Sequence, residues 1–301
     1  MKAKRKKTGL PPGSIIYTGS RKKEEVLIHF LQYNTDELTE LTFDNQGRGK
    51  LQVVNNEKVD WYDVRGMHDT KLIEQFGSTY NIHPLILEDI ADIYQRPKYE
   101  EYENGVFITF RALHFHKESL TVKTEQVALF FHHNFLLSFQ ETSSDLFAAV
   151  RNRIRSSSGK IRQRGADYLA YALVDASVDQ YFVVLDEMEN IIEQVESELA
   201  DHQDMRLKGR IHALRKEMLK IRKSVVPLRE AISRFSKSDS KFVHESSLLF
   251  IRDLYDHVIQ TMDVVENNRD ILNGLQELFI SEVSFKTVSY THLTLPTIYS
   301  V

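Results

Sequence analysis

The first half of the chain contains short runs of apolar, β-branched and aromatic residues that are separated by polar turn residues. Such runs are typical of β-strands that are buried on one or both faces. The predicted strands are Ser14–Gly19, Glu24–Phe30, Val59–Gly66, Asn104–His116, Leu120–His133 and Asn134–Glu141.

Two helices are predicted between the third and fourth of these strands. Asp69–Ile82 has its apolar residues at the spacing of one helix face. They are Leu72, Ile73, Phe76 and Tyr80. A second, short helix opens at His83, because proline at the next position suits the first turn of a helix. The pattern therefore predicts an α/β or α+β domain in the first half of the chain.

Strand signals disappear from Asp145 onward, and the pattern becomes helical. The predicted order is a serine-capped helix at Ser143–Arg155, a break at Ser156–Lys160, a long helical tract at Gln163–Phe235 that reverses near Ala200–Gly209, a polar linker at Ser236–Lys241 and a last long helix from about Glu245. The first arm of the long tract is acidic and the second is basic, so antiparallel arms would attract each other.

The last helix carries a near-heptad row of apolar residues. Its members are Ile251, Tyr255, Val258, Met262, Val265, Leu272 and Phe279, with Arg269 and Gln276 in the intermediate places. A row of this length needs a partner surface. Two partners remain open, which are the helical hairpin of the same chain and other copies of the chain around a shared axis.

Composition narrows the classes of function. Lys and Arg number 39 against 43 Asp and Glu, a formal charge of -4, which is unlike the basic footprint of a nucleic-acid-binding protein. Without cysteine, any metal must be held by oxygen or imidazole. No run approaches the roughly 18 apolar residues of a membrane span. We therefore expect the chain as given to be soluble, with no nucleic-acid partner.

Three acids lie toward the carboxyl end of the second predicted helix, where the helix dipole disfavours them. Glu88, Asp89 and Asp92 each cost a few tenths to about 1 kcal/mol there. Arg96 and Lys98 just downstream could compensate without any ligand. Glu88 and Asp89 are adjacent, about 100° apart on the helix, so they suit two cation sites better than one.

Two further acidic groups lie on the long helices. Asp175 and Asp179 are four residues apart on a mostly apolar helix, where two like charges need a partner. Asp253, Asp256 and His257 lie near the start of the last helix, where acids also complement the helix dipole. Acids on three separate elements suit a hard divalent cation that prefers oxygen, and magnesium fits this chemistry best.

Two alternatives to a magnesium site are a transition-metal site and the active site of a metal hydrolase. His114 and His116 share one face of a strand and could form half of a transition-metal site, although surface imidazoles explain them equally simply. No glycine-rich phosphate loop and no nucleophile elbow is present, so an enzyme would have to be a metal hydrolase built on Asp253, Asp256 and His257. We expect no enzyme activity.

Taken together, several segments resemble the cytoplasmic part of the CorA magnesium channel family. In chain order they are "GLPPGSIIYTG", "IHPLILEDI", "QRPKYEEYENGVFI", "RGADYLAYALVDASVDQYF", "PLREAI", "RDLYDHVIQTMDVVENNRDI" and "GLQELFISEVSFKT". The resemblance runs from about Gly9 to Thr287 in consistent order. It implies an α+β fold, in which an α/β/α sandwich with a mixed sheet is followed by a long antiparallel helical hairpin and a long stalk helix.

The resemblance also implies a function and a site. Members are homopentamers of the inner membrane that carry Mg²⁺, commonly also Co²⁺ and Ni²⁺, and this part faces the cytoplasm. Their regulatory site lies between protomers and matches Asp89 of one chain and Asp253 of the next, while a second site matches Glu88 and Asp175. Asp256 and Asp179 are further candidates for the metal.

The chain departs from the family at its end. Where the family continues into an apolar span and a Gly-Met-Asn signature, this sequence reads "VSYTHLTLPTIYSV". We expect 288–301 to be a non-native tail that follows an N-terminal domain at 1–160, a helical hairpin at 161–240 and a stalk helix at 241–287. The related ZntB zinc transporters share the architecture, and a soluble helical scaffold that binds a partner protein is the other alternative.

Overall fold

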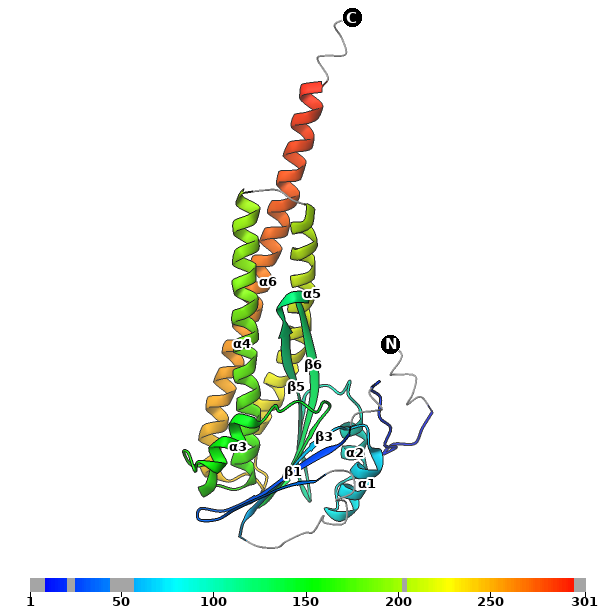
Figure 1. Cartoon of the computed structure of the whole chain (residues 1–301), viewed down its shortest axis with the longest axis vertical. Coiled ribbons are helices and arrows are strands. Elements are labelled where there is room, and N and C mark those ends of the chain that lie inside the picture. Colours follow the sequence, from blue (N-terminus) through cyan, green and yellow to red (C-terminus); the bar gives the residue numbers. More distant parts are fainter. Residues whose placement is uncertain (1–8, 21–24, 44–56, 202–204, 295–301) are drawn as a thin grey trace, which may run out of the picture.

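A seven-stranded mixed sheet forms the middle layer of the N-terminal half, and helices cover both of its faces (Figure 1). The computed structural model describes residues 9–20, 25–43, 57–201 and 205–294, and for 200, 201, 205 and 285–294 it describes the backbone alone. The strands are β1 (Leu27–Tyr33), β2 (Leu38–Phe43), β3 (Val59–Arg65), β4 (Lys98–Tyr102), β5 (Gly105–His116), β6 (Thr121–His132) and β7 (Phe135–Gln140).

The strand order is β2-β1-β3-β7-β6-β5-β4. β3 and β7 run parallel, and every other neighbouring pair is antiparallel. Alternation along β6 shows why both faces are covered. Val127, Leu129 and Phe131 enter the core on one face, whereas Ala128 and Phe130 enter the core on the other. The predicted α/β/α sandwich with a mixed sheet is therefore confirmed.

Two short helices, α1 (Thr70–Thr79) and α2 (Pro84–Ala91), cover one face of the sheet. Gly77 allows them to pack closely, because a Cβ atom at this position would lie 2.3 Å from a methyl carbon of Leu87. Tyr80 follows α1 and stacks on Phe135 of β7 with ring centroids 3.8 Å apart. These contacts fix α2, and with it the predicted acids, against the sheet.

The other face carries the remaining helices. They are α3 (Ala148–Arg155), α4 (Ala166–Asp201), α5 (Met205–Phe235) and α6 (Glu245–Thr294), with short 3₁₀ turns at Lys117–Ser119 and Ile161–Gln163. α4 and α5 form the predicted hairpin, whose turn at 202–204 lies outside the described residues. α6 packs against both arms and continues beyond them (Figure 1).

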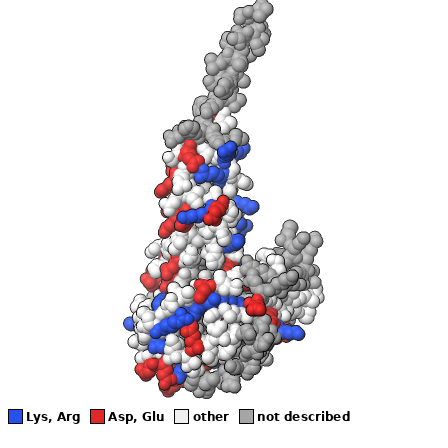
Figure 2. Space-filling view, in the orientation of Figure 1, with Lys and Arg blue, Asp and Glu red and all other residues white. Residues whose placement is uncertain are grey.

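Charge is divided between the arms of the hairpin as the sequence predicts. In Figure 2 acidic side chains gather on the side of α4 and basic ones on the side of α5. Glu198 of α4 and Arg210 of α5 form an ion pair across the hairpin, with Oε2 and Nη1 2.5 Å apart. Both side chains are partly exposed, so the pair contributes about 0–1 kcal/mol. The arms are held together by apolar packing rather than by charge.

The buried positions of α6 alternate at spacings of three and four residues. They are Ser247, Ile251, Leu254, Val258, Thr261, Val265, Asn268, Leu272, Leu275 and Phe279. This row packs into the groove between α4 and α5. Of the two partners that the sequence leaves open for the apolar row, the structure thus shows the helical hairpin of the same chain. Tyr255 and Met262 were predicted in the row but are only half-buried at its edge.

Three details of the sequence prediction are wrong. Ser14–Gly19 is not a strand. It is an extended loop whose Thr18 amide donates to the Ala91 carbonyl at the end of α2. The helix predicted from Ser143 begins at Ala148 and has no side-chain cap, because the Ser144 hydroxyl contacts Glu125 and Thr142 instead. β2 and β4 were not predicted, since both are edge strands with many polar residues.

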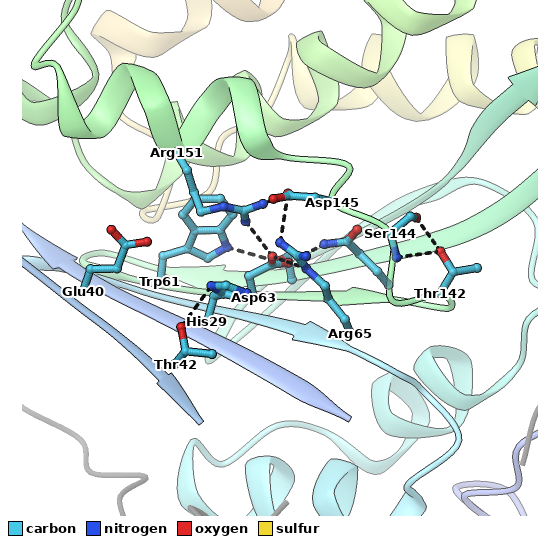
Figure 3. Close-up of polar contacts among 12 residues, drawn as sticks. His29, Glu40, Thr42, Trp61, Asp63, Arg65, Thr142, Ser144, Asp145 and Arg151 are labelled. Carbon is cyan, nitrogen blue, oxygen red and sulfur yellow. Dashed lines mark hydrogen bonds and ion pairs between the residues drawn. The ribbon is translucent and has the colours of Figure 1, made fainter. Parts of the chain in front are cut away.

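A buried ionic cluster ties α3 to the sheet (Figure 3). The carboxylate of Asp63 in β3 is fully buried and accepts hydrogen bonds from Arg151 Nη1 at 2.7 Å, Arg65 Nε at 3.2 Å, Ser138 Oγ at 2.8 Å and Gln140 Nε2 at 2.5 Å. Each lone pair of this carboxylate therefore has a donor. A buried charge that is paired in this way is stable only while its partners remain.

Removing one partner tests this requirement. Arg151→Met should lower the free energy of unfolding by about 3–5 kcal/mol, because it leaves the Asp63 charge buried without its strongest partner. Arg155→Met is the matched control one turn further along α3, where the arginine pairs with Glu40 at the surface, and it should cost about 0–1 kcal/mol. Urea unfolding of both variants measures the difference. Equal losses would show that Arg151 is not needed to compensate the buried charge of Asp63.

The packing of α6 gives a second prediction. Leu272→Ala should cost about 2–5 kcal/mol of unfolding free energy, because it leaves a cavity between the three long helices. Leu278→Ala on the same helix should cost less than about 0.5 kcal/mol, since Leu278 is 56% exposed. Thermal and urea unfolding compare the two. Similar costs would mean that the row at Leu272 is not buried within one chain.

Candidate metal site

The last turn of α2 and the residue that follows it carry the three acids that the sequence singles out, and each acid has different partners. Asp92 directly follows α2 as its C-cap, where its carboxylate accepts hydrogen bonds from the Thr18 hydroxyl at 2.9 Å and the Tyr94 amide at 3.2 Å. Asp92 therefore ties the N-terminal loop to the end of the helix. This role explains an acid at an unfavourable helix end without a cation.

Glu88 is held by the same N-terminal loop. Its Oε2 atom accepts a hydrogen bond from the amide of Gly13 at 2.8 Å. Gly13 has φ +84°, in the left-handed region that favours glycine, and a Cβ atom at this position would lie 3.0 Å from the Cβ atom of Pro84. The loop and the first turn of α2 thus fix the direction of the Glu88 carboxylate, which is half-buried.

Asp89 lies between two donors from the segment that follows α2. Lys98 Nζ is 2.7 Å from its Oδ2 atom, and Gln95 Nε2 donates to Oδ1 at 2.6 Å. Lys98 also contacts Glu100 Oε2 at 2.7 Å. Burial acts against the charge of Lys98, but the hydrogen bonds to Asp89 and Glu100 outweigh it and raise the pKa of Lys98. Of the two predicted compensating cations, Lys98 therefore serves Asp89, whereas Arg96 pairs with Glu230.

A second acidic group lies where α4 meets the lower part of α6. His257 is between two carboxylates, with Nδ1 3.7 Å from Asp175 Oδ1 and Nε2 4.0 Å from Asp253 Oδ2. The Tyr171 hydroxyl lies 3.5 Å from Asp175. Burial, and next the charge of Asp179, raises the pKa of Asp175, which means that its ionised form is poorly compensated in the single chain.

The structure brings some of the predicted ligands together and keeps others apart. Asp175 and Asp253 meet through His257, a connection that sequence reasoning missed although the spacing of Asp253 and His257 is that of one helix face. Glu88 and Asp89 lie on α2, across the sheet from α4 (Figure 1). Among the described residues, no group of three or more Asp, Glu or His side chains could hold a metal ion.

The remaining candidate metal ligands are Asp179, Asp256 and His114. Asp179 and Asp256 are both exposed to solvent. His114 Nε2 lies 3.5 Å from Glu125, whose carboxylate also accepts hydrogen bonds from the amide and hydroxyl of Thr142. The carboxylate of Glu125 thus binds the loop after β7. No metal arrangement forms around His114 within the described part of the chain.

Both acidic groups offer carboxylate oxygens, which are the type of ligand that a hard divalent cation prefers. A carboxylate has about four lone-pair positions, and the Asp89 carboxylate offers some of these to Lys98 and Gln95. Asp253 is 66% exposed and open to a ligand. Mg²⁺ commonly binds one or two carboxylates and keeps several of its waters, so the oxygens that each group offers suit it.

Comparison with known proteins places these features in a family. The family described as "CorA-like Mg2+ transporter protein" matches residues 56–295. The chain is 38% identical over 282 residues to the cobalt/magnesium transport protein CorA of Thermotoga maritima, which covers 93% of this chain and 80% of that protein. It is 27% identical to the putative metal ion transporter YfjQ of Bacillus subtilis, over 81% of this chain and 76% of that protein.

Solved structures show the same fold. The complete structure of the CorA magnesium transporter from Methanocaldococcus jannaschii superposes with a TM-score of 0.71 at 18% identity, over 93% of this chain and 84% of that one. The ZntB cytoplasmic domain from Vibrio parahaemolyticus superposes with a TM-score of 0.67 at 13% identity, over 85% and 98% of the two chains. Of the helices that are described here, none is both long and apolar enough to cross a membrane.

The raised pKa of Asp175 predicts a pH dependence in the absence of metal. The unfolded chain loses this proton near the ordinary value of 3.8, whereas the folded chain keeps it to higher pH. Stability contributed by the protonated carboxyl is therefore present below pH 3.8 and is lost as pH rises through the folded pKa. Asp175→Asn should unfold at higher urea concentration than wild type at pH 7, and the difference should disappear toward pH 3.8.

The measurement is urea unfolding in the presence of a chelator across this pH range. Asp186→Asn, at an exposed acid on the same helix, is the control and should follow wild type at every pH. A gain for Asp175→Asn that is independent of pH would show that desolvation of this carboxylate is not its cause.

Proposed function

The chain belongs to the family of CorA-like Mg²⁺ transporter proteins, and from that membership we propose that it is the metal-sensing and gating part of a divalent-cation channel. The relatives named as cobalt/magnesium transport proteins support Mg²⁺ and Co²⁺ as cargo. The proposal adds Mg²⁺ as the regulator and Ni²⁺ as a possible further cargo. In this proposal the channel lies in the inner membrane, and the part described here faces the cytoplasm.

One observation carries the proposal, which is that the two acidic groups lie on opposite faces of the sheet. Glu88 and Asp89 lie on α2, on one face of the sheet, whereas Asp175 and Asp253 lie on α4 and α6, on the other. A closed ring of copies lets the first side of one copy face the second side of the next. A bridging Mg²⁺ would then join Asp89 to the neighbour's Asp253 and Glu88 to its Asp175, in a homopentamer.

The charges of the carboxylates determine how the association of the subunits depends on Mg²⁺. Facing carboxylates repel one another when the cation is absent, so the subunits separate more easily at low Mg²⁺. Bound Mg²⁺ reverses the sign of the interaction and favours a closed, tightly packed ring. If each bridge supplies about 1–3 kcal/mol of coupling, several copies reach the roughly 5.5 kcal/mol that inverts a two-state population.

Zinc is the alternative cation. The fold match to a ZntB domain is compatible with it, and the imidazole of His257 between Asp175 and Asp253 is the observation that favours it. Imidazole suits zinc, whereas magnesium prefers oxygen ligands alone. Asp179 and Asp256 are secondary candidates, because both are exposed carboxylates close to these groups in sequence.

The bridging role is tested by Mg²⁺ titration of the melting temperature and of protease protection. Wild type should be stabilised by Mg²⁺, and the double variant Asp89→Ala/Asp253→Ala should lose the entire response, because both halves of the bridge are gone. Glu74→Ala/Asp270→Ala removes the same charge from exposed acids on α1 and α6 and should respond as wild type does.

Other outcomes separate the alternatives. A double variant that still responds fully would remove Asp89 and Asp253 from the mechanism. A soluble scaffold protein would show no response in any variant. A stronger response to Zn²⁺ than to Mg²⁺, lost when His257 is replaced, would favour the zinc alternative.

A further inference from the structure

We propose that Lys98 is a built-in counter-ion of Asp89 that competes with the regulatory cation and so sets the Mg²⁺ concentration at which the site fills. The inference rests on the proposed function, because it takes Asp89 as a ligand of the bridging cation. It adds a residue that tunes the site without being a ligand.

The fold holds the two charges together. Lys98 is the first residue of β4, where it pairs with Thr109 of β5, and Asp89 lies on the last turn of α2. Their charged atoms are 2.7 Å apart, and the two side chains are only 26% and 16% exposed. Because the pair is partly buried, salt screens its attraction less than it screens a surface pair.

A cation that approaches Asp89 therefore meets a positive charge already in place. Lys98 contacts the Oδ2 atom of the carboxylate, and Gln95 donates to the Oδ1 atom. A dication at Oδ2 would be repelled by the ammonium group at short range. Binding is then an exchange, in which the ammonium withdraws from Asp89 as the cation arrives.

Glu100 offers the ammonium an alternative partner. Its Oε2 atom lies 2.7 Å from Nζ of Lys98, and the Tyr102 hydroxyl donates to the same atom at 2.8 Å. Lys98 can therefore leave Asp89 and still keep one carboxylate. The ring of Phe107, with its centroid 5.6 Å from Nζ, adds a favourable contact for the charge. The exchange needs only a small movement of one flexible side chain.

This arrangement shifts the response of the site to higher cation concentration. A bare carboxylate at Asp89 would attract Mg²⁺ at the lowest concentrations, and the site would remain filled when the cell is depleted. An internal ammonium lowers the apparent affinity without removing any ligand. Loss of Lys98 should therefore tighten cation binding, whereas loss of Glu100 should weaken it.

Two substitutions with opposite expected effects test the proposal in the 301-residue chain. Mg²⁺ is titrated into chelator-treated protein, and the concentration that gives half of the maximal rise in melting temperature is the midpoint. Lys98→Met should lower the midpoint by about tenfold, within the usual range of coupling between two sites. Glu100→Gln should raise it severalfold, because Lys98 then has only Asp89 as a charged partner.

Lys58→Met is the matched control. Lys58 is enclosed to a similar degree, 24% exposed, and pairs with Glu37 at a distance from the site, so its loss should leave the midpoint unchanged. If Lys98 had only a structural role, Lys98→Met would change the melting temperature without Mg²⁺ and leave the midpoint in place.

The outcomes distinguish this inference from the proposed function. A wild-type response with an unchanged midpoint in Lys98→Met overturns the inference alone. Failure of wild type to respond to Mg²⁺ overturns both. If Lys98→Met does not fold, Glu100→Gln decides, and a midpoint that fails to rise overturns the inference.

Discussion

A central sheet that is buried on both faces is the constraint on which the arrangement of the acids depends. The alternation of apolar side chains along β6 requires one layer of helices on each face. α2 must lie on one side, and α4, with α6 packed on it, must lie on the other. A single chain therefore keeps Asp89 and Asp253 on opposite sides of the sheet. Under the proposed function, a second copy of the chain completes each acidic group.

The carboxylates of this chain differ in how fully the fold compensates them. Asp63 has four donors and no exposure, which is the condition of a structural charge. Asp92 is engaged in capping. Asp89 pairs with Lys98 and Gln95 and is partly exposed, and Asp175 is half-buried near other acids with its pKa raised. The raised pKa of Asp175 shows that its charge is less well compensated than that of Asp63.

Much of the fold can be read from local patterns. The long helices, the hairpin β5 and β6, and the start of α6 follow from periodicity and turn residues. The elements that were predicted wrongly depend on contacts between residues that are far apart in the sequence. Ser14–Gly19 has strand composition, but its backbone donates to the end of α2 rather than to a sheet neighbour. The sequence of β4 is polar and resembles a loop. It is an edge strand whose backbone pairs with β5 alone, and this pairing is not visible in the local sequence.

The candidate site was only partly predictable for the same reason. Local rules identified Glu88 and Asp89 as misplaced acids and Lys98 as a possible compensating charge, since all three lie within a short stretch. They could not show that Asp92 holds Thr18, or that His257 stands between two acids on different helices, because those partners are about 75 and 80 residues away in the chain.

α6 is one unbroken helix of 50 residues, which corresponds to a length of about 75 Å. Its N-terminal part carries Asp253 and His257, the second of which lies 3.7 Å from Asp175 of α4, and its C-terminal part extends past the hairpin (Figure 1). Such a rod acts as a lever: a tilt of about 5° at the acidic end displaces the far end by roughly 6 Å, given that length. Ångström-scale changes at the carboxylates would thus be amplified mechanically at the opposite end of the molecule.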